Sequence, residues 1–337
     1  MNERNSLRGS QVLISDVEPG LPYSKGLMAS KVMVTGLSPL RSYQVAERVE
    51  EILGSRGVAS VTTGEINELV TEVLEDLAGD RYAKNFVRWH AVERLDIPIV
   101  LLIGGATGVG KSTIATQIAA RLGIVRVVAT DAIREVMRAL FSNELMPTLY
   151  TSSFDAGTAL REPVPRGDDP VVVGFREQTA AVAVGLRAML DRAAVEGLSL
   201  IVEGAHVVPG FLDVEAYRDR FLAVPVIVTV DEEEMHRTHF AVRAMDLASR
   251  PGDRYVKGFD NIRKVQKYIR SQALAHGVPI IRNYSLDQAI TSIIDLVVQR
   301  ATERSAPATA SADGNGATSS ARLGAESVAE ARGRVSR

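Results

Sequence analysis

The chain has 337 residues, of which 46% are apolar, so it is long enough for about two domains with substantial cores. Its formal net charge of -2 argues against nucleic acid as the main partner, because nucleic-acid-binding proteins usually carry a clear basic excess. The absence of cysteine excludes disulfides, thiolate metal sites and a cysteine nucleophile, and it fits a reducing cytoplasm.

Neither a signal peptide nor a membrane span is predicted. The first residues, MNERNSLRGSQVLISDVEPG, contain no continuous apolar core of the kind that a signal peptide carries. No uninterrupted apolar run approaches the roughly 18 residues that a membrane-spanning helix needs. We therefore expect a cytoplasmic protein that does not bind membranes.

Residues 11–95 form the first predicted domain, which is small and mainly helical. Residues 39–57 place apolar side chains at helical spacing and end in glycine, which predicts a helix. A second helix fits TTGEINELVTEVLEDLAG, with Thr63 as its N-cap. The aromatic segment YAKNFVRW closes this domain. One apolar face of the second helix is formed by Ile66, Leu69, Val70, Val73, Leu74 and Leu77.

Residues 97–302 form a second predicted domain of the α/β class. Short, fully apolar runs alternate there with helical patterns, and such runs suit strands that are buried on both faces. Helices between consecutive strands imply βαβ units and a parallel sheet flanked by helices. The five runs are IPIVLLIGG, IVRVVAT, LSLIVEG, VPVIVTV and VPIIRN.

Residues 303–337 are rich in Ala, Ser, Gly, Thr and Arg. A segment of this composition can bury little apolar surface, so we predict a disordered tail. A role as an interaction tail is the alternative that the composition leaves open.

A phosphate-binding motif, GxxxxGK[ST], lies between the run IPIVLLI and the helical pattern STIATQIAARLG. Its glycines let backbone N–H groups converge on phosphate oxygens, and the positive end of the following helix faces the same phosphates. Lys111 adds a charge near the β- and γ-phosphates, and the hydroxyl of Ser112 can bind Mg²⁺. ATP and Mg²⁺ are therefore the predicted cofactors of a P-loop NTPase-type domain. The predicted nucleotide-binding residues are Gly105, Ala106, Thr107, Gly108, Val109, Gly110, Lys111, Ser112 and Thr113.

Three features favour a small-molecule kinase over a motor or a switch protein. The nucleotide-binding unit is short, the NKxD signature of GTPases is absent, and acidic residues follow two later strands. In open α/β sheets, ligands bind beyond the carboxyl ends of the strands. Asp131 and Glu203 are therefore candidates for catalytic or metal-binding roles.

Asp131 follows the run IVRVVAT and opens the helical pattern AIREVMRAL. It is well placed to accept the proton of a substrate hydroxyl, as a catalytic base, or to help hold Mg²⁺. Arg134 and Arg138 share a helical face with it, and together they suit an anionic substrate that bears a hydroxyl group. The alternative is that Asp131 is only a helix N-cap and that the arginines are solvated.

Glu203 ends the apolar run LSLIV, where many P-loop ATPases carry the carboxylate that orients Mg²⁺. Glu203 is a predicted metal ligand together with Ser112, and it is also a predicted substrate-binding residue. His206 follows closely and is either a substrate-binding residue or a buried structural histidine.

Two further arginines lie in DEEEMHRTHFAVRA, whose acidic start suits a helix N-terminus. On a mobile segment they could close over the phosphates, with Arg237 binding substrate and Arg243 balancing charge in the transition state. The alternative is that Arg237 and Arg243 are ordinary surface arginines.

Most of residues 97–290 resemble archaeal-type 2-phosphoglycerate kinase, in the order of that family's motifs. The matching stretches include IGGATGVGKSTIATQIAARLGI, VVATDAIREVMRAL, ELMPTLYTSSFDA, GFREQTAAV, LIVEGAHVVPG, HRTHFAVRA and VPIIRN. The resemblance implies transfer of the γ-phosphoryl group of ATP to the 3-hydroxyl of 2-phosphoglycerate, which yields 2,3-bisphosphoglycerate and ADP. The arginines that could bind the carboxylate and phosphate of this substrate by paired hydrogen bonds are Arg134, Arg138, Arg237 and Arg243.

Residues 11–95 resemble an ATP-cone, a small nucleotide-binding regulatory domain, through TTGEINELVTEVLEDL and the closing aromatic segment. The basic, glycine-containing strand start of ATP-cones is not evident in QVLISDVEPG. The resemblance therefore implies the cone fold, and it leaves open both nucleotide binding and docking without a ligand.

Two other functions fit the same residues. One is a P-loop kinase for a different small anionic alcohol. The other is a nucleotide-sensing regulatory protein that signals through its first domain or its tail. A sensor hydrolyses ATP slowly and ignores metabolites, whereas a kinase consumes ATP only with its acceptor.

Overall fold

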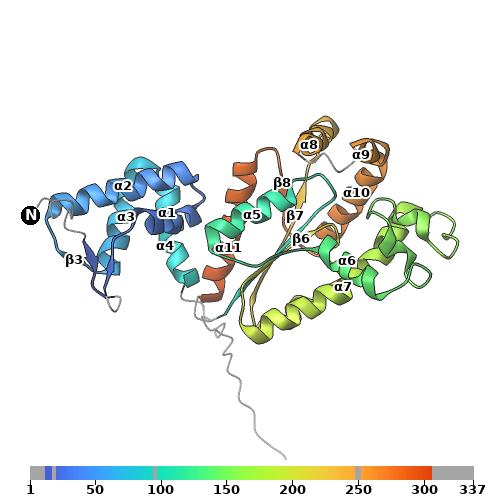
Figure 1. Cartoon of the computed structure of the whole chain (residues 1–337), viewed down its shortest axis with the longest axis horizontal. Coiled ribbons are helices and arrows are strands. Elements are labelled where there is room, and N and C mark those ends of the chain that lie inside the picture. Colours follow the sequence, from blue (N-terminus) through green and yellow to red (C-terminus); the bar gives the residue numbers. More distant parts are fainter. Residues whose placement is uncertain (1–11, 17–19, 94–96, 247–251, 306–337) are drawn as a thin grey trace, which may run out of the picture. The chain divides into compact units, whose positions relative to one another are not determined.

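Five parallel strands form the main sheet, in the spatial order β5-β6-β4-β7-β8. Three of them, β6, β7 and β8, are labelled in Figure 1. The computed structural model describes residues 12–16, 20–93, 97–246 and 252–305. Each of the five predicted apolar runs coincides with one strand, although β7 begins two residues before its run, so the predicted α/β class is confirmed. The strands are β4 (Ile99–Gly104), β5 (Val127–Ala129), β6 (Leu200–Gly204), β7 (Leu222–Thr229) and β8 (Ile280–Arg282).

Helices cover both faces of this sheet. Val100 and Leu102 of β4 pack in one cluster with residues of α6 and α7, while Leu101 and Ile103 pack in another with residues of α5, α10 and α11. Burial on both faces explains why β4 reads as a continuous apolar run. The helices are α5 (Lys111–Leu122), α6 (Thr130–Leu140), α7 (Pro170–Glu196), α8 (Glu233–Asp246), α9 (Gly252–Lys257), α10 (Phe259–Ala275) and α11 (Leu286–Ser305), with short 3-10 turns η2 (Pro147–Tyr150), η3 (Ala156–Ala159) and η4 (Glu215–Tyr217).

The first part of the chain is mainly helical, as predicted. Its helices α2 and α3 are the two that the apolar spacing indicates, and a small sheet of order β2-β1-β3 accompanies them. The elements are β1 (Leu13–Ile14), β2 (Leu21–Pro22), α1 (Lys25–Val32), η1 (Met33–Thr35), α2 (Pro39–Arg56), β3 (Ser60–Val61), α3 (Thr63–Leu77) and α4 (Asp80–Glu93).

The N-cap of α3 is Thr62, so the prediction of Thr63 was wrong by one residue. The Thr62 hydroxyl accepts a hydrogen bond from the Glu65 N–H at 3.2 Å, and the Glu65 carboxylate accepts one from the Thr62 N–H at 2.7 Å. This reciprocal capping box needs a spacing of three residues between its partners, which Thr62 and Glu65 have. Thr63 instead donates its N–H and its hydroxyl to Asp16.

The apolar face predicted for α3 is buried except at its end, where Leu77 is 44% exposed. Helix α4 carries the aromatic segment, and its Asn85 donates a hydrogen bond to Asp295 of α11 at 2.7 Å. Residues up to Ser305 form one unit. The division at residue 96 and the resemblance to an ATP-cone stay predictions.

Helix α11 continues to Ser305, so the first three residues of the predicted tail belong to this helix. The rest of the predicted tail, residues 306–337, lies outside the described residues. Among the helices of the described ranges, none is long and apolar enough to cross a membrane.

Candidate active site

The phosphate-binding loop joins β4 to α5 at the edge of the sheet where the parallel strands end. Gly108 and Gly110 in this loop have φ values of 86° and 88°, a region that favours glycine. Side chains also pack closely on both residues. A Cβ atom would lie 2.3 Å from Cζ of Phe240 at Gly108, and 2.6 Å from Nδ2 of Asn283 at Gly110. The loop therefore needs glycine at both positions.

Lys111 and Ser112 begin α5 directly after this loop. The Lys111 ammonium donates a hydrogen bond to the Ala106 carbonyl at 2.8 Å, and the residue is 8% exposed. The Ser112 hydroxyl donates to Oε1 of Glu203 at 2.8 Å. Glu203 lies beside the loop because β6 pairs with β4, with Glu203 opposite Ile103. The structure thus brings together the two residues predicted to bind Mg²⁺.

Asp131, Arg134 and Arg138 share one face of α6, as predicted. The Nε atom of Arg134 lies 3.7 Å from Oδ1 of Asp131, whose side chain is 75% exposed. The N-cap of α6 is Ala129, so Asp131 is not a helix cap. The Arg134 side chain is only 14% exposed, which contradicts the alternative of a solvated arginine there.

Glu135 was missed by the sequence analysis, and it lies between the two arginines. Its carboxylate accepts a hydrogen bond from Arg134 at 3.1 Å and another from Arg138 at 2.7 Å. The Nε atoms of both arginines are buried without a hydrogen-bond partner in the described part of the chain. A run of Arg-Glu with a second Arg three residues after the Glu was the available signal for this bridge.

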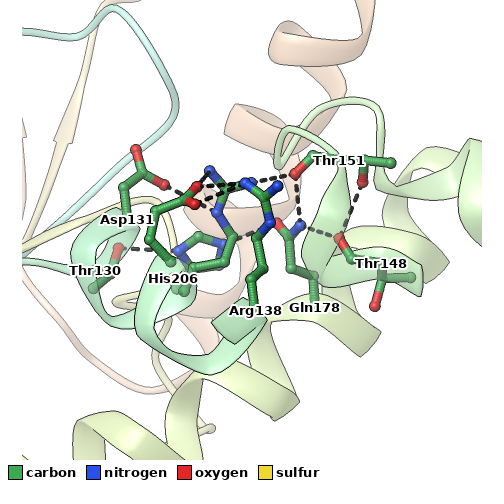
Figure 2. Close-up of polar contacts among 9 residues, drawn as sticks. Thr130, Asp131, Arg138, Thr148, Thr151, Gln178 and His206 are labelled. Atoms are coloured by element: carbon green, nitrogen blue, oxygen red, sulfur yellow. Dashed lines mark hydrogen bonds and ion pairs between the residues drawn. The ribbon is translucent and has the colours of Figure 1, made fainter. Parts of the chain in front are cut away.

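A buried polar network of Thr130, His206, Gln178, Thr148 and Thr151 adjoins this group (Figure 2). The amide nitrogen of Gln178 donates to the carbonyl oxygens of Thr148 and Thr151, the latter at 3.1 Å. Its oxygen therefore accepts from Nε2 of His206 at 2.9 Å. The other ring nitrogen, Nδ1, then accepts from the Thr130 hydroxyl at 3.0 Å.

His206 is fully buried, and both of its nitrogens are used in this network. The sequence left open a substrate ligand or a structural histidine, and this geometry is that of a structural one. It holds the start of α6 against α7 and, through Gln178, the segment that carries Thr148 and Thr151. Arg134 also donates to the Thr151 carbonyl, so the network and the arginines share this segment.

Helix α8 contacts the phosphate-binding loop through residues that the sequence analysis did not single out, namely His236, His239 and Phe240. Arg237 is exposed, and its guanidinium carbon lies 3.7 Å from the centroid of the Phe259 ring. Arg243 lies on the same helix, but its side chain is outside the described residues. The predicted lid roles of both arginines stay predictions.

Two buried histidines make the stability of the fold sensitive to acid. Burial lowers the pKa of His206 to about 4, and it lowers that of His236 to about 4 as well. An unfolded imidazole titrates near 6.5, so between about pH 6.5 and pH 4 only the unfolded chain binds these protons. The free energy of unfolding therefore rises with pH across this window and falls on acidification.

We expect the free energy of unfolding to fall by about 2 kcal/mol per histidine when the pH is lowered from about 7 to about 5. This pH range lies above the one in which carboxylates usually titrate. Urea denaturation at a series of pH values measures this change. His236→Gln should reduce the pH dependence, because it removes one of the two groups. Equal stability of the parent chain at both pH values would contradict the prediction.

Comparison with known proteins finds no matching family model. The chain is 39% identical to 2-phosphoglycerate kinase of Methanothermobacter thermautotrophicus over 274 residues, which are 81% of this chain and 89% of that protein. It is 38% identical to 2-phosphoglycerate kinase of Thermococcus kodakarensis over 285 residues, 84% of this chain and 96% of that one.

Among solved structures, shikimate kinase from Bacteroides thetaiotaomicron aligns with a TM-score of 0.33 and 18% identity, over 60% of this chain and 97% of that chain. A gluconokinase from Sinorhizobium meliloti aligns with a TM-score of 0.36 and 12% identity, over 62% of this chain and 98% of that chain. The archaeal relatives are far more similar in sequence and cover most of this chain. By that identity and coverage, the chain belongs to the 2-phosphoglycerate kinase family.

Proposed function

We propose that this chain transfers the γ-phosphoryl group of Mg-ATP to the 3-hydroxyl of 2-phosphoglycerate, which yields 2,3-bisphosphoglycerate. The observation that carries the proposal is the pair of arginines, Arg134 and Arg138, on the helix that follows the strand beside Glu203. A phosphate-binding loop beside a cluster of arginines suits a kinase with an anionic acceptor. The relatives' shared name supplies the identity of that acceptor.

Lys111 and the backbone N–H groups of the loop would bind the nucleotide phosphates. The Ser112 hydroxyl and the Glu203 carboxylate fit a Mg²⁺ ion, because hard oxygen ligands are those that Mg²⁺ prefers. The described residues hold no group of three or more acidic or histidine side chains suited to a metal, so phosphate and water oxygens would complete its coordination. A bound Mg²⁺ neutralises charge on the transferred phosphoryl group.

Arg134 and Arg138 would bind the phosphate or the carboxylate of the acceptor. The Glu135 carboxylate bridges both guanidinium groups, so the space between them accommodates a planar anion. The side chain of Glu135 is 53% exposed and can leave this position when a substrate anion enters. The terminal N–H groups of both guanidinium groups, which Glu135 now occupies, are the donors that such an anion would use.

Asp131 would accept the proton of the 3-hydroxyl. Its carboxylate is open to solvent and lies beside Arg134, so an acceptor held by that arginine would lie close to it. Phosphoryl transfer depends mainly on positioning and charge stabilisation, so Asp131 should contribute less than Lys111. Arg243 remains the proposed source of a further positive charge from α8.

2-Phosphoglycerate should accelerate ATP consumption, and 3-phosphoglycerate should be at least about 10²-fold slower. The second isomer carries its phosphate on the oxygen that acts as nucleophile in the first, and its remaining hydroxyl is displaced. A coupled ADP assay with each isomer measures the rates, and phosphorus NMR identifies the product.

Two outcomes would contradict the proposal. Stimulation by glycerate or another alcohol, with none by either isomer, would retain a kinase and change its acceptor. Slow ATP hydrolysis that no acceptor accelerates would favour a nucleotide sensor.

A further inference from the structure

We propose that His236 and His239 are positioning residues of the nucleotide site: their imidazole N–H groups hold two carbonyls of the phosphate-binding loop so that two loop amides face the phosphates. The inference rests on the proposed binding of Mg-ATP at this loop. It adds a specific role for α8, the helix that the sequence suggested only as a carrier of lid arginines.

The two contacts are short and join segments far apart in the chain. Nε2 of His236 lies 2.8 Å from the carbonyl oxygen of Thr107, and Nδ1 of His239 lies 3.0 Å from that of Gly108. A carbonyl oxygen can only accept, so each imidazole nitrogen must be the donor. His236 therefore donates through Nε2 and His239 through Nδ1. The two residues are three positions apart, so both lie on one face of α8.

Holding a carbonyl also orients the amide on the other side of the same peptide bond. In a trans peptide the C=O and the following N–H point in opposite directions. Because the Thr107 carbonyl is turned to α8, the N–H of Gly108 is turned away from it, and the Gly108 carbonyl fixes the N–H of Val109 in the same way. Convergent backbone N–H groups are the donors by which such loops bind phosphate.

The surroundings of His236 make its contact rigid. The residue is fully buried, and its ring stacks on Phe240, which in turn packs against Gly108. Its second nitrogen, Nδ1, faces Nη1 of Arg263 at 3.5 Å. Arg263 donates to the carbonyls of Val230 and Asp231, directly after β7, at 2.7 and 2.8 Å. The strand next to β4 is thus connected through Arg263 and His236 to the loop.

A purely structural role for these histidines is the competing explanation, and matched variants separate the two. A glutamine amide reaches about as far as Nε2 of histidine, and an asparagine amide about as far as Nδ1. His236→Gln and His239→Asn therefore keep an N–H donor at the position of the bonding ring nitrogen. His236→Asn and His239→Gln also introduce an amide, but they place it away from that position, so the donor to the carbonyl is lost. The measurement is the Kd of the full chain for Mg-ATP by titration calorimetry, with the melting temperature of each variant.

We expect the two variants that lose the donor to bind Mg-ATP about 10-fold more weakly, and the two that keep it to remain within about threefold of the parent. The KM for the acceptor should change little in all four. Equal Kd values for donor-keeping and donor-losing variants would overturn the proposal.

His236 is buried, so its variants could fail to fold, and in that case the half-buried His239 pair decides by the same comparison. A parent chain that does not bind Mg-ATP would overturn the nucleotide site itself, and with it this inference. A parent that binds ATP but phosphorylates no acceptor would overturn the proposed function and leave the histidine comparison valid.

Discussion

Replacing Lys111 by alanine is expected to lower kcat by about 10²–10³-fold while the protein stays folded. The Lys111 ammonium is almost buried at the start of α5, and it is held by the Ala106 carbonyl within the phosphate-binding loop. A charge in such a site interacts strongly with phosphate oxygens because little water screens it. The group is needed most when charge develops on the transferred phosphoryl group, so kcat should fall more than ATP affinity.

Steady-state kinetics with saturating acceptor and circular dichroism of the variant check this expectation. Lys84→Ala is the matched control, because the Lys84 side chain is 66% exposed on α4 and pairs with Asp80 one turn away. The control should retain the activity of the parent. A folded Lys111→Ala variant with activity within a few-fold of the parent would refute the assignment of the phosphate site.

Replacing Arg134 by alanine is expected to raise the KM for 2-phosphoglycerate by about 10²-fold and to leave the Kd for Mg-ATP within about twofold. Arg134 is the more buried of the two arginines, and its guanidinium already contacts Asp131, Glu135 and the Thr151 carbonyl. A substrate anion in the place of Glu135 would form charge-assisted hydrogen bonds with it. Arg134→Lys should not restore the KM, because an ammonium lacks the paired donors of a guanidinium.

Arg192→Ala on α7 is the matched control, since this arginine is 70% exposed and pairs with Glu196 of the same helix. Kinetics with varied acceptor, calorimetry with Mg-ATP and melting temperatures together separate substrate binding from folding. An unchanged KM for the acceptor in Arg134→Ala would remove this arginine from the substrate site. A large parallel loss of ATP affinity would instead indicate that the variant disturbs the whole active site.

Local patterns in the sequence were enough to predict a nucleotide site at one loop of the chain. The glycines and Lys111 lie between an apolar strand and a helix, and the chemistry of phosphate binding needs that order. Glu203 could be placed near Ser112 because carboxyl ends of parallel strands meet at one edge of the sheet. The common face of Asp131 and Arg134 followed from the period of the α-helix alone.

The sequence by itself therefore determined the α/β class, the five strands and the phosphate-binding loop, since each depends on residues near one another in the chain. Only the tertiary structure decided which side chains from distant parts of the chain contact the phosphate-binding loop and one another. His236 and His239 contact carbonyls of the loop that are 129 and 131 positions away in the chain, and Gln178 of α7 reaches His206 in the turn after β6. A histidine that donates to a distant carbonyl leaves no periodic signal, because packing of whole helices on the sheet sets that contact.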